Sequence, residues 1–155
     1  MSINWGQAQP APLAFWNLAH SYFPVTRNLG IFNSPGHEDH DEGRALDLGL
    51  LVVRRNENEI AWGIIDKVLK PNHDEIGWSY FIYDQWIWYP DVRGQNKGGF
   101  VGDHTNHIHI SWGQTSSQWT NFPKSRVAMS KLLMALTGGI EDDATQTSEV
   151  RPYCQ

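Results

Sequence analysis

The chain has little cysteine, a deficit of positive charge and no long apolar run. Its one cysteine, Cys154, cannot form an internal disulfide, so the fold does not depend on redox state. Twelve Lys and Arg against 17 Asp and Glu give a net charge of −5, without the basic face that a nucleic-acid partner requires. No stretch approaches the ~20 apolar residues of a membrane span. These absences argue against a disulfide scaffold, a nucleic-acid-binding protein and a membrane-spanning protein.

The N-terminal segment 1–12 also lacks the basic patch and the apolar run of a signal peptide. Three expectations stay open: the chain stays where it is made, it leaves by another route, or a leader is missing from this sequence.

The composition is that of an ordinary globular protein. A length of 155 residues, with 40% hydrophobic and 19% charged residues, is enough for one domain with its own core. We predict a single domain over residues 1–138 that begins with a loose arm at 1–10, followed by a polar, acidic and disordered tail at 139–155. Core packing is the favoured role for any one of the eight tryptophans, ahead of a sugar- or peptide-binding groove. We expect a monomer.

The order of predicted elements favours an α+β fold. Apolar residues at helical spacing predict helices over 11–22, 56–69 and 123–137. Apolar or alternating patterns predict strands over 44–53, 76–83, 85–89 and 107–112, and the glycine-rich segment 90–103 is typical of a loop beside a site. Because only Asp84 separates two of these strands, we expect a bulge there or one long bent strand. The whole pattern predicts a small central antiparallel sheet flanked by helices.

Five of the seven histidines fall in two clusters about sixty residues apart, at 37–47 (HEDHDEGRALD) and 103–109 (DHTNHIH). Side chains alternate faces along a strand, so His107 and His109 point the same way. A spacing of seven with a turn at Gly43 lets the chain bring His40 and Asp47 together. Two His and one Asp can hold a catalytic zinc with one coordination position open. The clusters therefore predict a Zn²⁺ cofactor, bound on the face of the sheet, and a metallohydrolase.

The histidines also admit other interpretations. A lone histidine is usually a surface or hydrogen-bonded core residue, and we interpret His20 and His73 in that way. Taken alone, the first cluster would be a solvated acidic loop, but two clusters in one short chain favour a metal. A non-haem iron oxygenase also uses two His and one carboxylate, but with the first two ligands closer in sequence than these. A carbonic anhydrase would need a third histidine ligand that the sequence does not plainly supply.

The pattern His40-x-x-Gly43-x-Ala45-x-Asp47 followed by His107-x-His109 resembles the motif pair of the LAS superfamily of zinc proteins. That superfamily covers lysostaphin-type peptidases, D-Ala-D-Ala carboxypeptidases and dipeptidases, and the hedgehog signalling domain. The resemblance covers residues 25–112 and implies His40, Asp47 and His109 as zinc ligands and His107 as a catalytic residue.

Further residues narrow the resemblance. His37 and His104, three residues before His40 and His107, resemble the pattern of penicillin-insensitive murein endopeptidases. The stretch 86–88 (WIW) with the second cluster is similar to cell-wall hydrolase domains of actinobacteria and their phages. The resemblance implies a peptidoglycan peptide as substrate and action at the bacterial cell wall, in the periplasm or outside the cell. Cytoplasmic synthesis with phage-type release would fit the missing leader.

Two features depart from the carboxypeptidase pattern. Those enzymes carry a Glu base shortly before the last ligand, and here Asp103 or His104 would have to replace it. Their carboxylate-binding Tyr-Arg stretch is also not clear, with Arg27 as the one candidate. Both departures favour an endopeptidase.

The roles of the remaining histidines stay open. His107 or His104 would orient or deprotonate a water molecule, or stabilise the oxyanion and protonate the leaving amine. His37 would be an outer partner of the metal site, a substrate contact or a structural residue. The main alternative is a non-catalytic zinc-containing binding module on the same scaffold, as the hedgehog domain exemplifies. The presence of both His104 and His107 argues against that alternative.

Overall fold

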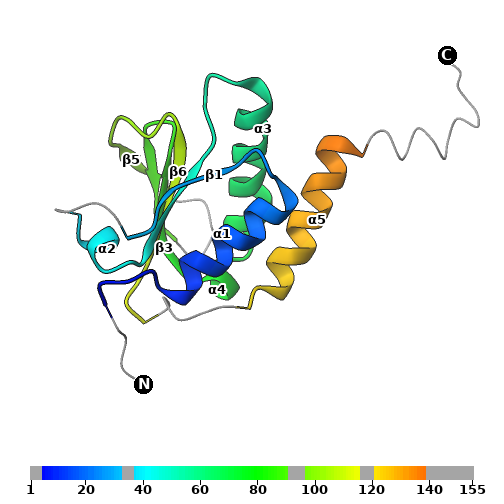
Figure 1. The fold of residues 1–155 in the computed structure, drawn as a ribbon. Coiled ribbons are helices and arrows are strands. Elements are labelled where there is room, and N and C mark those ends of the chain that lie inside the picture. The colour runs from blue at the N-terminus through cyan, green and yellow to red at the C-terminus, as the bar shows by residue number, and fades with distance from the viewer. Residues whose placement is uncertain (1–4, 33–36, 91–96, 116–120, 139–155) are drawn as a thin grey trace, which may run out of the picture.

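A computed structural model of the chain describes residues 5–32, 37–90, 97–115 and 121–138 (Figure 1). The predicted tail at 139–155, with Cys154, lies outside the described residues. The arm predicted to be loose over residues 1–10 is fixed to the domain near its end. Gln9 is buried, and its backbone N–H donates a hydrogen bond to the carbonyl of Gly43 (2.9 Å). Within the described part, no helix has the length and apolar character needed to cross a membrane.

Six antiparallel strands form one sheet in the order β1-β2-β6-β3-β4-β5. The strands are β1 Arg27–Gly30, β2 Ala45–Gly49, β3 Trp78–Tyr83, β4 Trp86–Trp88, β5 Lys97–Phe100 and β6 His107–Trp112. Strand β6 lies between β2 and β3, so the strand that carries the second histidine cluster pairs with a strand on each side. In this register Asp47 lies directly opposite His109.

Helices complete an α+β fold and confirm the predicted class. They are α1 Pro10–Tyr22, α2 Glu38–Asp41, α3 Arg55–Gly63, α4 His73–Ile76 and α5 Pro123–Thr137, and a π-helical turn η1 over Ile64–Leu69 continues α3. In Figure 1, α1, α3 and α5 cover one side of the sheet and α2 lies on the other. The predicted helix over 56–69 thus corresponds to α3 and η1 together, and it ends just before Pro71, where the chain cannot continue a helix.

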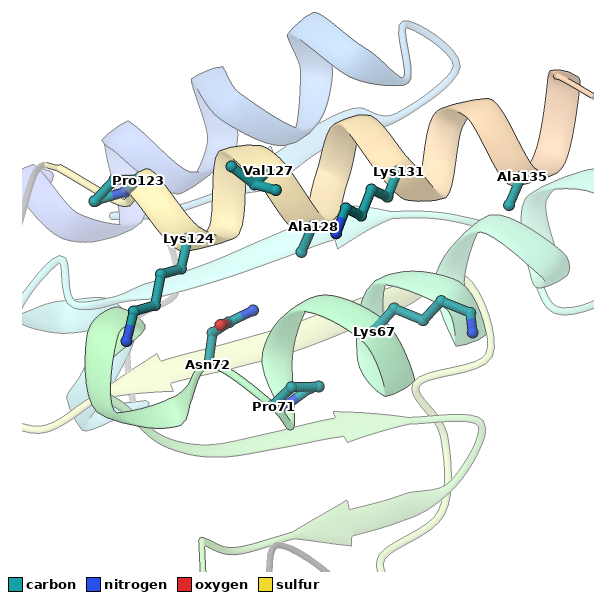
Figure 2. A pocket seen from close by; sticks show the side chains of 9 residues that line it. All are labelled: Lys67, Pro71, Asn72, Pro123, Lys124, Val127, Ala128, Lys131 and Ala135. Carbon is teal, nitrogen blue, oxygen red and sulfur yellow. The ribbon is translucent and has the colours of Figure 1, made fainter. Parts of the chain in front are cut away.

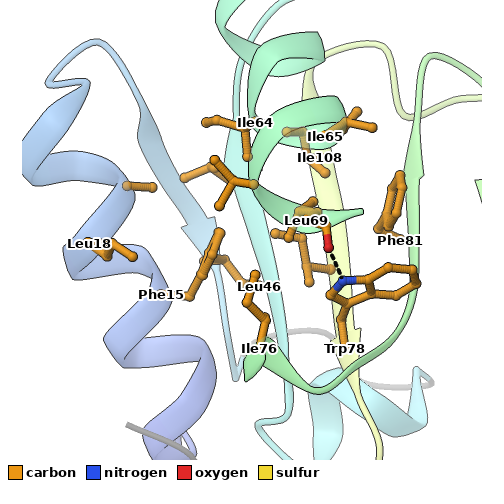
Figure 3. Close-up of a cluster of buried hydrophobic side chains, with 14 of the residues drawn as sticks. Phe15, Leu18, Leu46, Ile64, Ile65, Leu69, Ile76, Trp78, Phe81 and Ile108 are labelled. Atoms are coloured by element: carbon orange, nitrogen blue, oxygen red, sulfur yellow. Dashed lines mark hydrogen bonds between the residues drawn. The ribbon is translucent and has the colours of Figure 1, made fainter. Parts of the chain in front are cut away.

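The core lies between the sheet and the helices on its covered side. Strands β2 and β6 send Leu46, Leu48, Ile108 and Ile110 to this side, all fully buried. In Figure 3 these strands face side chains of α1 and η1, and the indole N–H of Trp78 donates to the carbonyl of η1 residue Leu69 (2.9 Å). Alternation then sends the intervening residues of β2 and β6 to the opposite face.

The predicted bulge or bent strand at Asp84 is wrong. Strand β4 begins at Trp86, which leaves Asp84 and Gln85 as a two-residue turn with φ of +47° and +77°. Left-handed backbone at both central positions is the pattern of a type I′ hairpin, which matches the twist of the flanking strands. Strand β5 lies in the predicted loop 90–103 and was missed because glycine is rare in strands.

Candidate metal centre

The two histidine clusters meet in one pocket of about 370 Å³ on the face of the sheet opposite the core. Strands β2, β3 and β6 form its floor, and α2 and the segment before β6 contribute the remaining side chains. The pocket is lined by His37, Asp39, His40, Asp47, Tyr80, Ile82, His104, His107 and His109. Residues of both histidine clusters therefore share one cavity.

His40, Asp47 and His109 present three possible ligand atoms that all lie within 4.8 Å of one another. Asp47 Oδ2 lies 3.3 Å from His40 Nε2, and Asp47 Oδ1 lies 2.9 Å from His109 Nδ1. The register of β2 and β6 places Asp47 against His109. His40 lies in α2, and the turn that joins α2 to β2 requires Gly43, whose φ is +76° and whose Cβ would collide with the backbone of Gln7.

The second nitrogen of each of these histidines also has a partner. His40 Nδ1 lies 2.9 Å from the carbonyl of Ile31, so this nitrogen carries a proton and Nε2 is the nitrogen that faces Asp47. His109 Nε2 lies 3.0 Å from Asp39 Oδ2, which leaves Nδ1 to face Asp47. Metal-bound histidines hold their outer nitrogen in this way, by a backbone carbonyl or a carboxylate. The residues therefore fit a divalent transition metal, and two imidazoles with one carboxylate are ligands that zinc shares with iron and other metals.

Asp39 and Tyr80 are functional candidates that sequence reasoning missed. The Tyr80 hydroxyl donates to Asp39 Oδ2 (2.6 Å), and its ring stacks on His109 at a centroid distance of 5.5 Å. Asp39 was hidden in an acidic run in which every residue looked solvated, although it is only 8% exposed. Alternation places Tyr80 on the same strand face as Ile82, but only the register of β3 against β6, which sets Ile82 opposite His109, brings Tyr80 to the pocket.

The carboxylates and histidines hold one another in charged states. Burial alone would raise the pKa values of Asp39 and Asp47, but their hydrogen bonds, His109 foremost, hold both pKa values well below the usual range. Burial alone would lower the pKa of His109, yet the same two carboxylates raise it to about 9. Burial and the Asp39 carboxylate raise the pKa of Tyr80, so its hydroxyl stays a donor. Without metal, protons therefore occupy the nitrogens to which a cation would bind, and a bound cation would replace those protons.

His104 and His107 lie beside this group, with ring centroids 5.0 Å apart. His107 Nε2 is 3.4 Å from Asp47 Oδ1, and its Nδ1 is 2.6 Å from Asn106 Oδ1. Burial lowers the pKa of His107 to about 4, against the opposing effect of Asp47. His104 Nδ1 donates to the carbonyl of Gly102 (3.1 Å). Together with His109, these two residues form a second group whose possible ligand atoms lie within 4.8 Å of one another.

The other predicted site residues lie in different places. His37 lines the pocket but is exposed. Asp103 is exposed and is not among the lining residues. Arg27 Nη2 forms an ion pair with the buried Glu57 (2.8 Å), and Arg27 does not line the pocket either. The structure therefore brings His37 to the pocket and leaves Asp103 and Arg27 outside it.

His20 and His73, interpreted as ordinary structural histidines, make local hydrogen bonds away from the pocket. His20 Nδ1 lies 3.1 Å from the carbonyl of Thr26, and His73 Nε2 lies 2.9 Å from the carbonyl of Trp78. Neither lines the pocket.

A second and larger cavity, of about 790 Å³, lies between α5 and the end of η1 (Figure 2). Its lining is mainly apolar, and its charged residues are Lys67, Lys124 and Lys131. It contains no His, Asp or Glu among the lining residues described. Size alone would favour this cavity, but it lacks the ligand and acid–base groups that the smaller pocket brings together.

The fold and the pocket define an α+β protein with a buried His/Asp group that could bind a metal ion. Comparison with protein families gives a match over residues 4–109 to the family described as VldE, C-terminal domain. The chain belongs to this family, and the matched region includes both histidine clusters and ends at His109. No curated protein matches the chain, and no solved structure matches it.

Proposed function

We propose that this protein is a zinc-dependent peptidase of peptidoglycan that acts at the bacterial cell wall. It would hydrolyse peptide bonds of stem peptides or their cross-links. The observation that carries the proposal is the arrangement of one pocket. Three ligand atoms from His40, Asp47 and His109 converge there, and His104 and His107 lie beside them. A binding site alone would need the first three residues but not the two further imidazoles.

A zinc ion held by His40, Asp47 and His109 would polarise the scissile carbonyl and lower the pKa of a bound water towards about 7. The chain's own work is then proton transfer. His104 and His107 each have Nδ1 hydrogen-bonded to an oxygen, so Nε2 can accept a proton. One takes the proton of the attacking water as the C–O bond forms, and the leaving nitrogen receives a proton as the C–N bond breaks.

The pocket favours an endopeptidase over a carboxypeptidase. An enzyme that recognises a free C-terminal carboxylate commonly needs a cation to bind it. Among the described residues that line the pocket there is no Arg or Lys, and the guanidinium of Arg27 is paired with Glu57. A substrate that continues through the pocket as a peptide or cross-link would not need that cation.

The test is digestion of purified peptidoglycan by the zinc-loaded protein, with separation of the muropeptides by mass. We expect split cross-links, loss of product after chelation, and recovery when zinc is restored. His109→Ala should lose zinc and activity together, whereas His20→Ala, which changes a histidine outside the pocket, should keep both. Binding to peptidoglycan without any product would overturn the peptidase and leave a non-catalytic zinc-containing module.

A further inference from the structure

We propose that the pocket holds a second divalent metal ion on His104 and His107, next to the first and joined to it by Asp47, when metal is in excess. This inference builds on the zinc site of the proposed function, but it concerns metal binding and can be tested without a substrate. The relevant observations are the directions of the lone pairs, the two oxygens of Asp47 and the backbone that carries His104.

The lone pairs of His104 and His107 are available for a metal. His104 Nδ1 faces the carbonyl of Gly102, which accepts only, so Nδ1 carries the proton and Nε2 the lone pair. His107 Nδ1 faces Asn106 Oδ1 in the same way. This is the arrangement that prepares His40 for a metal, with Nδ1 on a carbonyl and Nε2 directed towards Asp47 in the pocket. The two rings are 5.0 Å apart between centroids, close enough to share one ion.

The two possible ligand groups overlap at His109, and only one of them can use it. His109 Nδ1 faces Asp47 and His109 Nε2 faces Asp39, so both of its nitrogens are engaged on the side of the first site. A second ion therefore needs another third ligand besides His104 and His107.

Asp47 supplies that third ligand. Its Oδ2 lies 3.3 Å from His40 Nε2, and its Oδ1 lies between the two groups, 2.9 Å from His109 Nδ1 and 3.4 Å from His107 Nε2. A carboxylate with one oxygen between two groups of ligands can bridge two ions, and paired metal sites in hydrolases place their ions about 3.5–4 Å apart. The pocket volume of about 370 Å³ leaves room for both.

The backbone at His104 is held in an unfavourable conformation, which is typical of functional positions. Asp103 and His104 have φ of +47° and +58°, in the left-handed region that non-glycine residues seldom adopt. The carbonyl of His104 accepts a hydrogen bond from the N–H of Asp84 (2.8 Å) in the β3–β4 turn. The hairpin turn therefore fixes the segment that places His104 over the pocket.

Occupation of this second position has a consequence for the chemistry. The metal would use the same lone pairs that His104 and His107 need to accept protons. We therefore expect the proposed peptidase to be active with one zinc per chain and inhibited when excess zinc fills the second position.

The experiment is a calorimetric titration of the metal-free protein with Zn²⁺, checked by metal content after dialysis at low and at high free zinc. We expect two binding steps in the wild type. His104→Ala should keep the first step and weaken the affinity of the second at least about 10-fold. His107→Gln, which removes the other imidazole of the second site, should have the same effect. His73→Ala, which removes a histidine outside the pocket, should keep both steps. Circular dichroism confirms that each variant is folded.

One ion per wild-type chain at high zinc, or a second step that survives both His104→Ala and His107→Gln, would overturn the inference. Its failure is distinct from that of the proposed function. Peptidoglycan cleavage with a single ion would leave the peptidase standing and remove the second site. Two bound ions without any cleavage would support the second site and overturn the peptidase.

Discussion

Strands β2 and β6 have two faces with different roles. Alternate residues of the same strands pack against the helices on one face and line the pocket on the other. One face presents Leu46, Leu48, Ile108 and Ile110 to the helices, all fully buried. The other presents Asp47, His107 and His109 to the pocket. Apolar side chains gain from contact with many neighbours, whereas each pocket residue depends on one or two specific partners at hydrogen-bonding distance. The comparison indicates that stability is concentrated on one face and chemistry on the other.

The largest effect is expected from Asp47→Asn on the pocket face. Asp47 is one of three ligands, and structural zinc sites bind with about 10–16 kcal/mol, so loss of its charge should weaken metal binding about 1000-fold. A competition titration against a coloured chelator measures this. The metal-free variant should lose less unfolding free energy than Leu48→Ala, because it loses the pairing of Asp47 with His109 but no core contact. A large drop in melting temperature without metal would contradict the separation of the two faces.

The matched change on the core face is Leu48→Ala, one residue along the same strand. Leu48 is fully buried, so the variant should lose about 2–5 kcal/mol of unfolding free energy. Urea denaturation of the metal-free protein measures the loss. The metal bound per folded chain should stay unchanged at low temperature. If Leu48→Ala weakened metal binding as strongly as Asp47→Asn, the two faces would not be independent.

A smaller effect is expected from Asp39→Asn, because Asp39 holds His109 rather than facing the metal. Loss of a carboxylate partner of a metal-bound histidine typically weakens metal binding about 10–100-fold. Titration with Co²⁺ gives both the affinity and an absorption spectrum that reports the geometry of the site. Asp41→Asn is a matched control on the same short helix, since Asp41 is exposed and does not line the pocket. Equal effects of both variants would show that Asp39 has no particular role.

The smallest effect concerns Glu57, the buried acid outside the pocket, whose side chain is 1% exposed. Burial alone would raise its pKa, but hydrogen bonds from the Leu51 N–H and from Arg27 lower the pKa below its usual value. Its contribution to stability is therefore present above about pH 4.5 and is lost as the pH falls through the lowered pKa. We expect Glu57→Gln to reduce the loss of stability on acidification. Denaturant melts at pH 5 and pH 3 measure it, and unchanged pH dependence would contradict the assignment.

Local patterns account for the parts of the molecule that the sequence predicted well. Strand β6 was predicted over its full range, 107–112, because its residues alternate strictly between polar and apolar. The grouping of Asp47 with His109 was expected from the resemblance of the two clusters to the LAS motif pair. Helices α1 and α5 likewise follow from apolar spacing and from the prolines and glycines at their ends.

The parts that were missed depend on partners far away in the sequence. Tyr80 is hydrogen-bonded to Asp39, 41 positions away in the sequence, and Arg27 to Glu57, 30 positions away. Neither pair therefore leaves a local pattern. Strand β5 was missed because glycine seldom occurs in strands, and its Gly98 lies against a neighbour from another strand end: a Cβ there would lie 2.6 Å from the ring of Tyr89. Such contacts become visible only when the fold is known.

The central place of β6 has a consequence for how the pocket exchanges with solvent. Because β6 is paired on both sides, its amide hydrogens should be among the slowest to exchange with deuterated water, limited by global unfolding. His40, by contrast, belongs to a helix of four residues, whose amides should exchange through local opening. Ligands of one ion would then sit on elements of very different opening rates. Release of the ion should follow the opening rate of α2, whereas the sheet face that carries Asp47 and His109 stays closed.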